Sequence, residues 1–344
     1  MNSPSRRDTA TSGDPGVQAG LATVMPPGGQ ITLRLQGWRY SGGVWIGLVA
    51  LIIVVAILKP ALIEPEGWRL LLRQVSVIGL LAVGQTVVML TAGIDLSVGS
   101  VVAVVNWVAS SLLMSSDSNN IKIIPLCLGI GAFVGLLNGI SIAKLRVPPF
   151  VMTLGMLFVV LAAGQWWTGG ITSGGASDLV ITIGQGQAGP IPVPFLILAG
   201  VALAVYLVLK LTPYGRRVYA LGTNPRAAFL AGVNTDRVLV ASYIICGTTA
   251  ALAGLLLTGF IGYGATTAGQ EPVLLQSIAA VVIGGTVLAG GRGSIIGTVG
   301  GVLFLGLLFN LLVVSDIAQS GRFMAQGFTL IVAAALYSRF WRRG

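Results

Sequence analysis

Residues 212–238 read TPYGRRVYALGTNPRAAFLAGVNTDRV, the longest polar and basic interruption between the strongly apolar segments of this chain. The stretch carries four arginines against a single acid, Asp236. The apolar segments on either side of it have about the length that a helix needs to cross the roughly 30 Å of a bilayer's hydrocarbon. A polar insert of this length has a role beyond turning the chain, and we expect it to form a surface for contact with another protein.

The composition of the whole chain indicates a membrane protein. Of the 344 residues, 55% are hydrophobic and 9% are charged, and the mean hydropathy is +0.91. A soluble domain carries about 25% charged residues. The apolar residues form ten blocks, at 44–58, 70–91, 97–115, 122–143, 149–168, 193–211, 238–262, 273–290, 294–314 and 322–340. We therefore predict an all-α, polytopic membrane protein with about ten transmembrane helices, of which 70–91 and 273–290 run into glycine-rich turns and can be broken.

The basic residues give the chain an orientation. Cytoplasmic loops of membrane proteins are enriched in Lys and Arg. With the N-terminus inside and ten spans, fifteen of the 20 Lys and Arg residues lie in the cytoplasm. The other five are Lys59, Arg69, Arg73, Lys122 and Arg322. This bias predicts that both termini and the stretch 212–238 are cytoplasmic. Residues 1–40, rich in Ser, Thr, Pro, Gly and Gln, are expected to be a disordered cytoplasmic tail before a transmembrane domain at 41–344.

The chain lacks the residues that several functional classes require. The chain has no histidine, and its two cysteines, Cys127 and Cys246, are isolated within apolar blocks. It has no GxxxxGK[ST] phosphate loop and no pair of acids within a span. We therefore expect no catalytic residue, no metal site and no cofactor on this chain. The net charge of +10 lies mainly in loops, so we expect no nucleic-acid partner.

The turn TAGIDLSVGS at 91–100 is the sharpest local signal. Asp95 is the only acid near it, and an aspartate there can cap the helix that follows by accepting its free N–H groups. Asp95 can instead belong to a transport path or gate, and the sequence leaves both readings open. A similar pattern of glycine turn and small-residue helix recurs near Gly290–Val299, which is either chance or a weak internal repeat.

Small residues recur four apart in two blocks and form flat stripes. The stripes are Gly131, Gly135 and Gly139, and Gly293, Gly297 and Gly301. Such a stripe lets another helix backbone approach closely. Packing within the chain and a dimer seam both fit the pattern.

Four stretches, in order, give the chain a family resemblance. They are GIDLSVGS (93–100), VPPFVMTLGM (147–156), TPYGRRVYALGTNPRAAFLAGV (212–233) and IAAVVIGGTVLAGGRGSIIGT (278–298). Together they resemble the permease subunits of bacterial ATP-binding-cassette (ABC) importers for sugars such as ribose, xylose, arabinose and galactosides, which are related to the branched-chain amino acid permeases. The resemblance covers roughly residues 70–340. It implies the type II importer permease architecture and a function in moving a monosaccharide or related polyol across the bacterial inner membrane.

The resemblance also implies partners. These are an ABC ATPase subunit that binds ATP and Mg²⁺, a periplasmic or lipid-anchored substrate-binding protein, and a second permease, with a homodimer expected. The largest outer loop, 169–192, is the expected contact for the binding protein. Which sugar is carried stays open. The alternatives are a relative of the same family that carries branched-chain amino acids, nucleosides or a quorum signal, and an ion-coupled secondary transporter.

Two groups of residues follow as candidate sites. Importer permeases contact their ATPase through a short coupling helix, and the pattern Asn-Pro-Arg-Ala-Ala before a glycine resembles it, with Asn224 suited to an N-cap and Gly232 or Asn234 to the end. Both alanines are small enough to seat in a cleft of the partner. The candidate coupling residues are Gly215, Arg216, Gly222, Asn224, Arg226, Ala227, Ala228 and Gly232. The candidate residues of a translocation path or gate are Gln85, Gly93, Asp95, Ser97, Asn106, Asn138 and Gln165.

Overall fold

The computed structural model describes the backbone of residues 29–269 and 271–341. By contacts between residues the chain divides into two units, Met1–Trp38 and Arg39–Gly344. The described part of the first unit, residues 29–38, is helical, because α1 begins at Gly29. Residues 1–28 of the expected tail at 1–40 lie outside the described part of the chain, and the tail stays a prediction.

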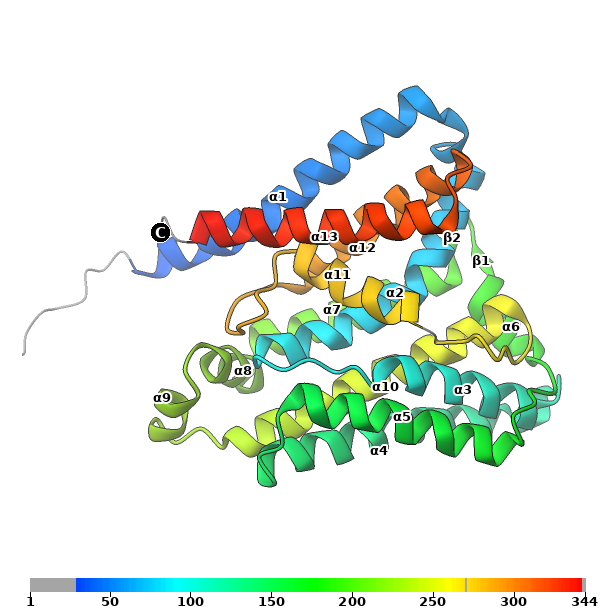
Figure 1. Cartoon of the computed structure of the whole chain (residues 1–344), viewed down its shortest axis with the longest axis horizontal. Coiled ribbons are helices and arrows are strands. Elements are labelled where there is room, and N and C mark those ends of the chain that lie inside the picture. The colour runs from blue at the N-terminus through cyan, green and yellow to red at the C-terminus, as the bar shows by residue number, and fades with distance from the viewer. Residues whose placement is uncertain (1–28, 270, 342–344) are drawn as a thin grey trace, which may run out of the picture. The chain divides into compact units, whose positions relative to one another are not determined.

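The described residues are almost entirely helical, and every element after α1 belongs to the second unit (Figure 1). In order the elements are α1 (Gly29–Leu58), η1 (Pro60–Leu62), α2 (Pro65–Leu90), α3 (Val98–Leu113), η2 (Asp117–Asn119), α4 (Asn120–Lys144), α5 (Pro149–Thr168), α6 (Asp178–Gln185), β1 (Gln187–Ala188), β2 (Ile191–Pro192), α7 (Val193–Leu211), α8 (Pro213–Thr223), α9 (Pro225–Leu230), α10 (Thr235–Ile261), α11 (Glu271–Ile283), α12 (Ile295–Val314) and α13 (Gln319–Trp341). Each of the ten apolar blocks of the sequence holds one helix, so the all-α prediction is confirmed.

Not every apolar block is long enough to span. Within the described residues, six helices have the length and composition to cross a membrane, namely α2, α4 with η2, α5, α7, α10 and α12. The helix α11 has 13 residues, about 20 Å at 1.5 Å per residue, which is less than the roughly 30 Å of hydrocarbon. It ends at Ile283 rather than near residue 290, because Gly285 adopts a left-handed φ of 90°. The expected break after α11 is thus present, and so is the one after α2, where residues 91–97 leave the helix.

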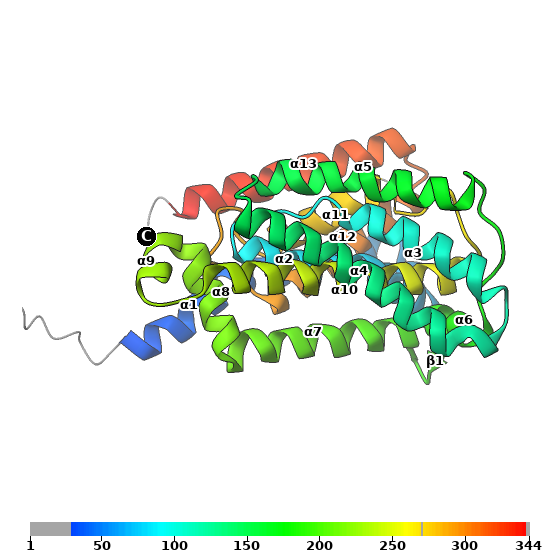
Figure 2. The same ribbon diagram turned by 90° about the horizontal axis from the view of Figure 1, so that it is seen from below.

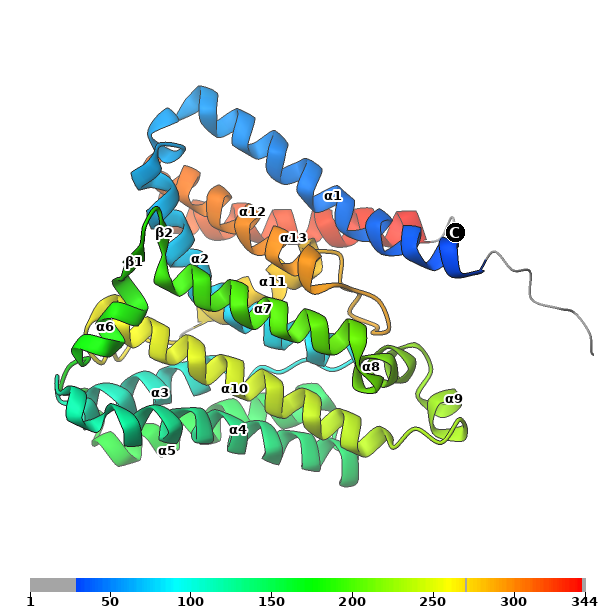
Figure 3. The same cartoon turned by 180° about the vertical axis from the view of Figure 1, so that it is seen from behind.

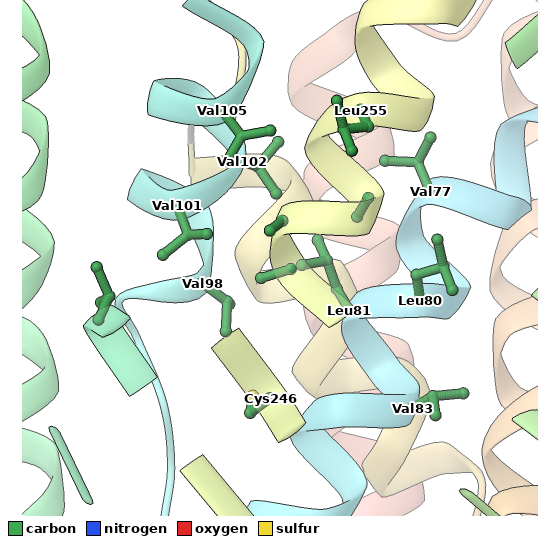
Figure 4. Close-up of a cluster of buried hydrophobic side chains, with 14 of the residues drawn as sticks. Val77, Leu80, Leu81, Val83, Val98, Val101, Val102, Val105, Cys246 and Leu255 are labelled. Carbon is green, nitrogen blue, oxygen red and sulfur yellow. The ribbon is translucent and has the colours of Figure 1, made fainter. Parts of the chain in front are cut away.

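The helix α2 lies at the centre of the second unit. In its most apolar window 78% of the residues are buried, against 17% for α5 and 22% for α7. Figure 2 shows α5 and α7 on opposite sides, with α10 and α4 between them. Valine and leucine side chains of α2 and α3 meet Cys246 and Leu255 of α10 in the main apolar core (Figure 4). The exposed apolar faces of the outer helices are those that lipid would cover.

The glycine stripes serve packing within the chain. A Cβ on Gly135 would lie 2.2 Å from the carbonyl oxygen of Tyr243 on α10, and one on Gly131 would lie 2.2 Å from that of Gly247. In the second stripe, a Cβ on Gly301 would lie 2.1 Å from the carbonyl oxygen of Ala280 on α11. The helix pairs α4–α10 and α11–α12 therefore approach backbone to backbone. Of the two readings of the stripes, packing within the chain is the one that the structure supports.

The connections gather at two opposite ends of the helices. Figures 1 and 3 show α8 and α9 at one end, together with the C-terminal end of α13, and α6 with the β1–β2 hairpin at the other. The hairpin pairs Gln187 with Pro192 and Ala188 with Ile191. Segment 169–192, the expected contact for a binding protein, thus lies far from the 212–238 stretch.

Candidate functional site

The stretch 212–238 forms two short helices with clear end signals. The side chain of Asn224 accepts a hydrogen bond from the backbone N–H of Ala227 at 3.0 Å, and Pro225 is the first residue of α9. Gly232 follows this helix with a φ of 81°, a conformation in which glycine is favoured. Asn234 then accepts from the N–H of Arg237 at 3.1 Å and begins α10. The predicted caps of this helix are therefore confirmed.

The exposed face of α9 differs from the one expected. Ala228 is only 5% exposed and packs inside the chain, whereas Phe229 and Leu230 are 67% and 78% exposed. Ala227 and Arg226 are exposed as well. The expectation that both alanines seat in a partner is therefore wrong for Ala228. The side chain of Ala228 points toward the rest of the chain, because packing beneath this short helix sets its orientation. Two adjacent apolar side chains within a polar stretch were the sequence signal for the face of α9 that is exposed.

The helix α8 lies against the chain through small residues. Gly215, Val218, Leu221 and Gly222 are buried, while Arg216 and Arg217 are exposed. A Cβ on Gly222 would lie 1.8 Å from the carbonyl oxygen of Leu90, at the end of α2. The same Cβ would lie 2.4 Å from the backbone nitrogen of Gly291. The end of α8 therefore contacts both glycine-rich turns that interrupt the spanning helices.

The two turns also bind one another at this point. The N–H of Gly291 donates to the carbonyl of Leu90 at 2.9 Å, and the hydroxyl of Tyr219 on α8 donates to the carbonyl of Gly293 at 3.1 Å. Burial raises the pKa of Tyr219 to about 12, so this hydroxyl keeps its proton at neutral pH. We call the contacts among Leu90, Gly222 and Gly291 the α8 junction. It joins the two segments whose sequence patterns resemble each other.

A second link between the same two segments lies deeper in the fold. The hydroxyl oxygens of Thr86 on α2 and Thr298 on α12 are 2.7 Å apart, so one hydroxyl donates to the other, which in turn can donate to a carbonyl one turn earlier in its own helix. Both side chains are buried. The two broken elements are thus held together at the α8 junction and within the membrane-spanning part.

Five of the predicted path or gate residues meet around the turn 91–97. One carboxylate oxygen of Asp95 accepts from the N–H of Ser97 at 2.9 Å and from its hydroxyl at 2.6 Å. The amide of Asn138 on α4 donates to the Ser97 hydroxyl at 2.8 Å. Oriented to suit its neighbours, the Gln85 amide donates to the Asp95 carbonyl at 3.2 Å and accepts from the Asp95 N–H at 3.1 Å. Gly93 is the fifth member, since a Cβ there would lie 2.5 Å from the hydroxyl oxygen of Tyr243.

These contacts refine the role of Asp95. Its side chain does not bond to the first N–H groups of α3, which begins at Val98, but closes a turn onto Ser97, the N-cap residue. Gln85 and Asn138 have no exposed surface, and Asp95 and Ser97 are 1% exposed. In this conformation the cluster fixes the turn rather than lining an open passage.

The other two predicted path residues lie elsewhere. Asn106 donates to Thr258 at 3.0 Å and to the carbonyl of Tyr263 at 3.1 Å, and it accepts from the N–H of Ala265 at 2.8 Å. This fully bonded amide shapes the turn after α10. Gln165 lies on the exposed face of α5, away from the cluster. Neither contacts the residues around Asp95. The spacing of amides along the sequence could not distinguish these three environments.

The family described as branched-chain amino acid transport system / permease component matches residues 69–336. The ribose import permease protein of Bacillus subtilis (strain 168) is 39% identical over 309 residues, which cover 89% of this chain and 95% of that protein.

Two further relatives are named for the import of other sugars. The fructose import permease protein of Rhizobium meliloti is 36% identical over 320 residues, 88% of this chain and 87% of its own length. The galactose/methyl galactoside import permease protein of Haemophilus influenzae is 30% identical over 317 residues, 87% of this chain and 94% of its own. No solved structure matches the chain. Within the described residues, no group of three His, Cys, Asp or Glu side chains is placed to hold a metal ion.

Proposed function

The chain belongs to the permease components of the branched-chain amino acid transport system family, and from that premise we propose that it imports a monosaccharide as the membrane-spanning subunit of an ABC importer. It is a multi-pass membrane protein and a transport subunit. The relatives that cover most of its length are named for ribose, fructose and galactose import, which supports a sugar or related polyol as the substrate.

The α8 junction is the observation that carries the proposed mechanism. In the proposal, an ATPase subunit that binds ATP and Mg²⁺ docks on the exposed face of α9, and its movement displaces α8. Because Gly222 touches the end of α2 and the turn before α12, such a displacement moves both broken helices together. Bistable packing of this kind converts a small shift into a change of state. The cluster around Asp95 then keeps the turn 91–97 intact while the helices move, which is our proposal for its gating role.

The remaining partners and the location belong to the same proposal. We place the chain in the bacterial inner membrane with both termini in the cytoplasm, supported by the Lys and Arg bias and by α13 ending at the same end of the molecule as α8 and α9 (Figure 1). A periplasmic or lipid-anchored binding protein delivers the sugar at the 169–192 end. A second permease, in a homodimer, encloses the path. The cofactors act on the ATPase, and this chain holds none.

The docking face gives a direct test. Leu230→Asp places a charge on the exposed apolar face, so we expect the ATPase to be lost from the purified complex while the permease remains in the membrane. Asp236→Asn is the matched control, since Asp236 is an exposed residue of the same stretch outside α9. Full retention of the ATPase by Leu230→Asp would show that α9 is not the docking helix.

The transport claim is tested in proteoliposomes that contain the permease, the ATPase and the binding protein. We expect ATP-dependent uptake of at least one of labelled ribose, fructose or galactose. The family description favours one alternative, import of branched-chain amino acids, so labelled leucine belongs in the same panel, with a nucleoside and a quorum signal as further probes. Uptake of leucine and of no sugar would overturn the proposal. Uptake driven by an ion gradient without the ATPase would indicate a secondary transporter.

A further inference from the structure

A cavity of about 410 Å³ lies between α2, α11, α12 and α13. Small-molecule sites in proteins enclose about 300–1,000 Å³. The cavity is formed by the first part of α2, the last part of α12 and the first part of α13, which lie toward the end opposite α8 and α9 (Figure 1). It contains none of the seven residues named above as candidates for a path or gate.

The lining is mainly apolar and carries five polar side chains. The polar side chains are Gln74, Gln276, Asn310, Arg322 and Gln326, and they come from all four helices. Of these, Asn310 is only 8% exposed. Within the described part of the chain, the side chains of the four amides make no hydrogen bond. Gln74 is exposed, and Gln276 and Gln326 are half-buried, so Asn310 is the buried amide of the four. A buried amide without a partner costs about 1–3 kcal/mol, and Nε of Arg322 is also buried without a hydrogen-bond partner. These two groups favour a polar ligand in the cavity.

The chemistry of the lining selects the class of ligand. Each amide both donates and accepts, as a sugar hydroxyl requires. Phe309 adds an apolar face, with the guanidinium carbon of Arg322 at 5.5 Å from the centre of its ring. Among the described residues no acidic side chain lines the cavity, which disfavours a cation. Polar groups that fix orientation, set among apolar walls, are typical of small-molecule sites.

We propose that this cavity is a sugar-binding station of the permease, in which Gln74, Gln276, Asn310 and Gln326 bind hydroxyl groups of a neutral monosaccharide. The inference rests on the proposed function and adds to it the residues that contact the substrate. Its position toward the 169–192 end makes it the first station for a sugar released by the binding protein. The charge of Arg322 also suits an anionic lipid headgroup, which the test below separates from a sugar.

The first experiment measures uptake of labelled ribose, fructose and galactose by the complete complex in proteoliposomes. Asn310→Leu and Gln276→Leu remove one amide each, and we expect about tenfold lower uptake, which corresponds to about 1.4 kcal/mol. Met324→Leu is the control, since Met324 is 75% exposed on α13 outside the cavity. Wild-type uptake that both amide variants retain would overturn the sugar station and leave the proposed function intact. Absence of uptake by the wild-type complex would reject the proposed function and the station with it.

The second experiment does not depend on how the amide variants fold. Val313 lines the cavity and is 39% exposed, so Val313→Cys introduces a reactive thiol, whereas the native Cys127 and Cys246 are buried. We expect the transported sugar to slow alkylation of this thiol at least threefold and to leave alkylation of Met324→Cys unchanged. Equal alkylation with and without sugar would contradict the proposal. Protection by vesicles rich in anionic phospholipid, and not by sugar, would assign the cavity to a lipid.

Discussion

Gly222→Ala should separate ATPase binding from sugar movement. The added methyl would lie 1.8 Å from the carbonyl oxygen of Leu90 and 2.4 Å from the nitrogen of Gly291. Because contacts between heavy atoms are optimal at about 3.5–4.0 Å, α8 and the two turns must move apart by about 1.5–2 Å. Overpacking of this kind costs about 1–3 kcal/mol, and loss of the Gly291–Leu90 hydrogen bond adds about 0.5–1.5 kcal/mol.

The size of the displacement determines the expected phenotype. Helix shifts of about 1–2 Å are large enough to transmit a change of state across a packed interface, so a gap of similar size at the α8 junction should absorb the movement of α8. We expect ATP-dependent sugar uptake to fall at least tenfold. The exposed residues Phe229 and Leu230 are not altered, so the ATPase should still co-purify with the permease.

The assay compares Gly222→Ala with a second glycine-to-alanine substitution at a position where the added methyl has room. Gly200→Ala is the control. Gly200 lies within α7, the helix that precedes α8, and no atom lies within 4 Å of the added methyl. An alanine there should be neutral or slightly stabilising, since glycine costs a helix about 0.5–1 kcal/mol. Uptake, ATPase co-purification and thermal stability are measured for both variants. If Gly222→Ala transports sugar as Gly200→Ala does, the α8 junction does not transmit the movement.

Substitutions at two other sites test the turn at Asp95 and the close contact between α4 and α10. Asp95→Ala leaves the N–H and hydroxyl of Ser97 without their acceptor, so we expect a loss of about 1–3 kcal/mol in thermal unfolding; Asp95→Asn keeps an acceptor oxygen and should lose less, and an equal loss for both would contradict this role. Gly135→Leu cannot fit against α10, where a Cβ already lies 2.2 Å from a carbonyl oxygen, and should prevent accumulation of folded permease. Gly129→Leu on the same helix, with no atom within 4 Å of its Cβ, should accumulate as the wild type does.

The caps around α9 show how far local sequence reasoning reaches. Asn224, Pro225 and Gly232 act through their own backbone and their nearest neighbours, so their roles follow from residue type and order. The same holds for the glycine turns that break the chain after α2 and α11. The direction of Ala228 depends instead on what lies beneath α9, and no local pattern contains that information.

The roles of the buried amides, in contrast, could not be predicted from the local sequence. Gln85, Asn138, Asn106 and Asn310 all appear in the sequence as isolated polar residues in apolar blocks. In the structure the first two brace the turn at Asp95, Asn106 shapes the turn after α10, and Asn310 faces a cavity without a partner. Their partners lie on other helices, up to 159 positions away in the case of Asn106 and Ala265.

The sequence by itself determined that this protein is an all-α membrane protein, how its apolar blocks are ordered and where its longest polar and basic stretch lies, because hydrophobicity and helix caps act over short distances along the chain. Only the tertiary structure decided that α8 contacts both broken helices at once, that Phe229 and Leu230 form the exposed face, and that four amides surround one cavity. Those features arise where segments distant in sequence pack backbone to backbone, and glycines at the contacts permit an approach that the spacing of residues alone does not reveal.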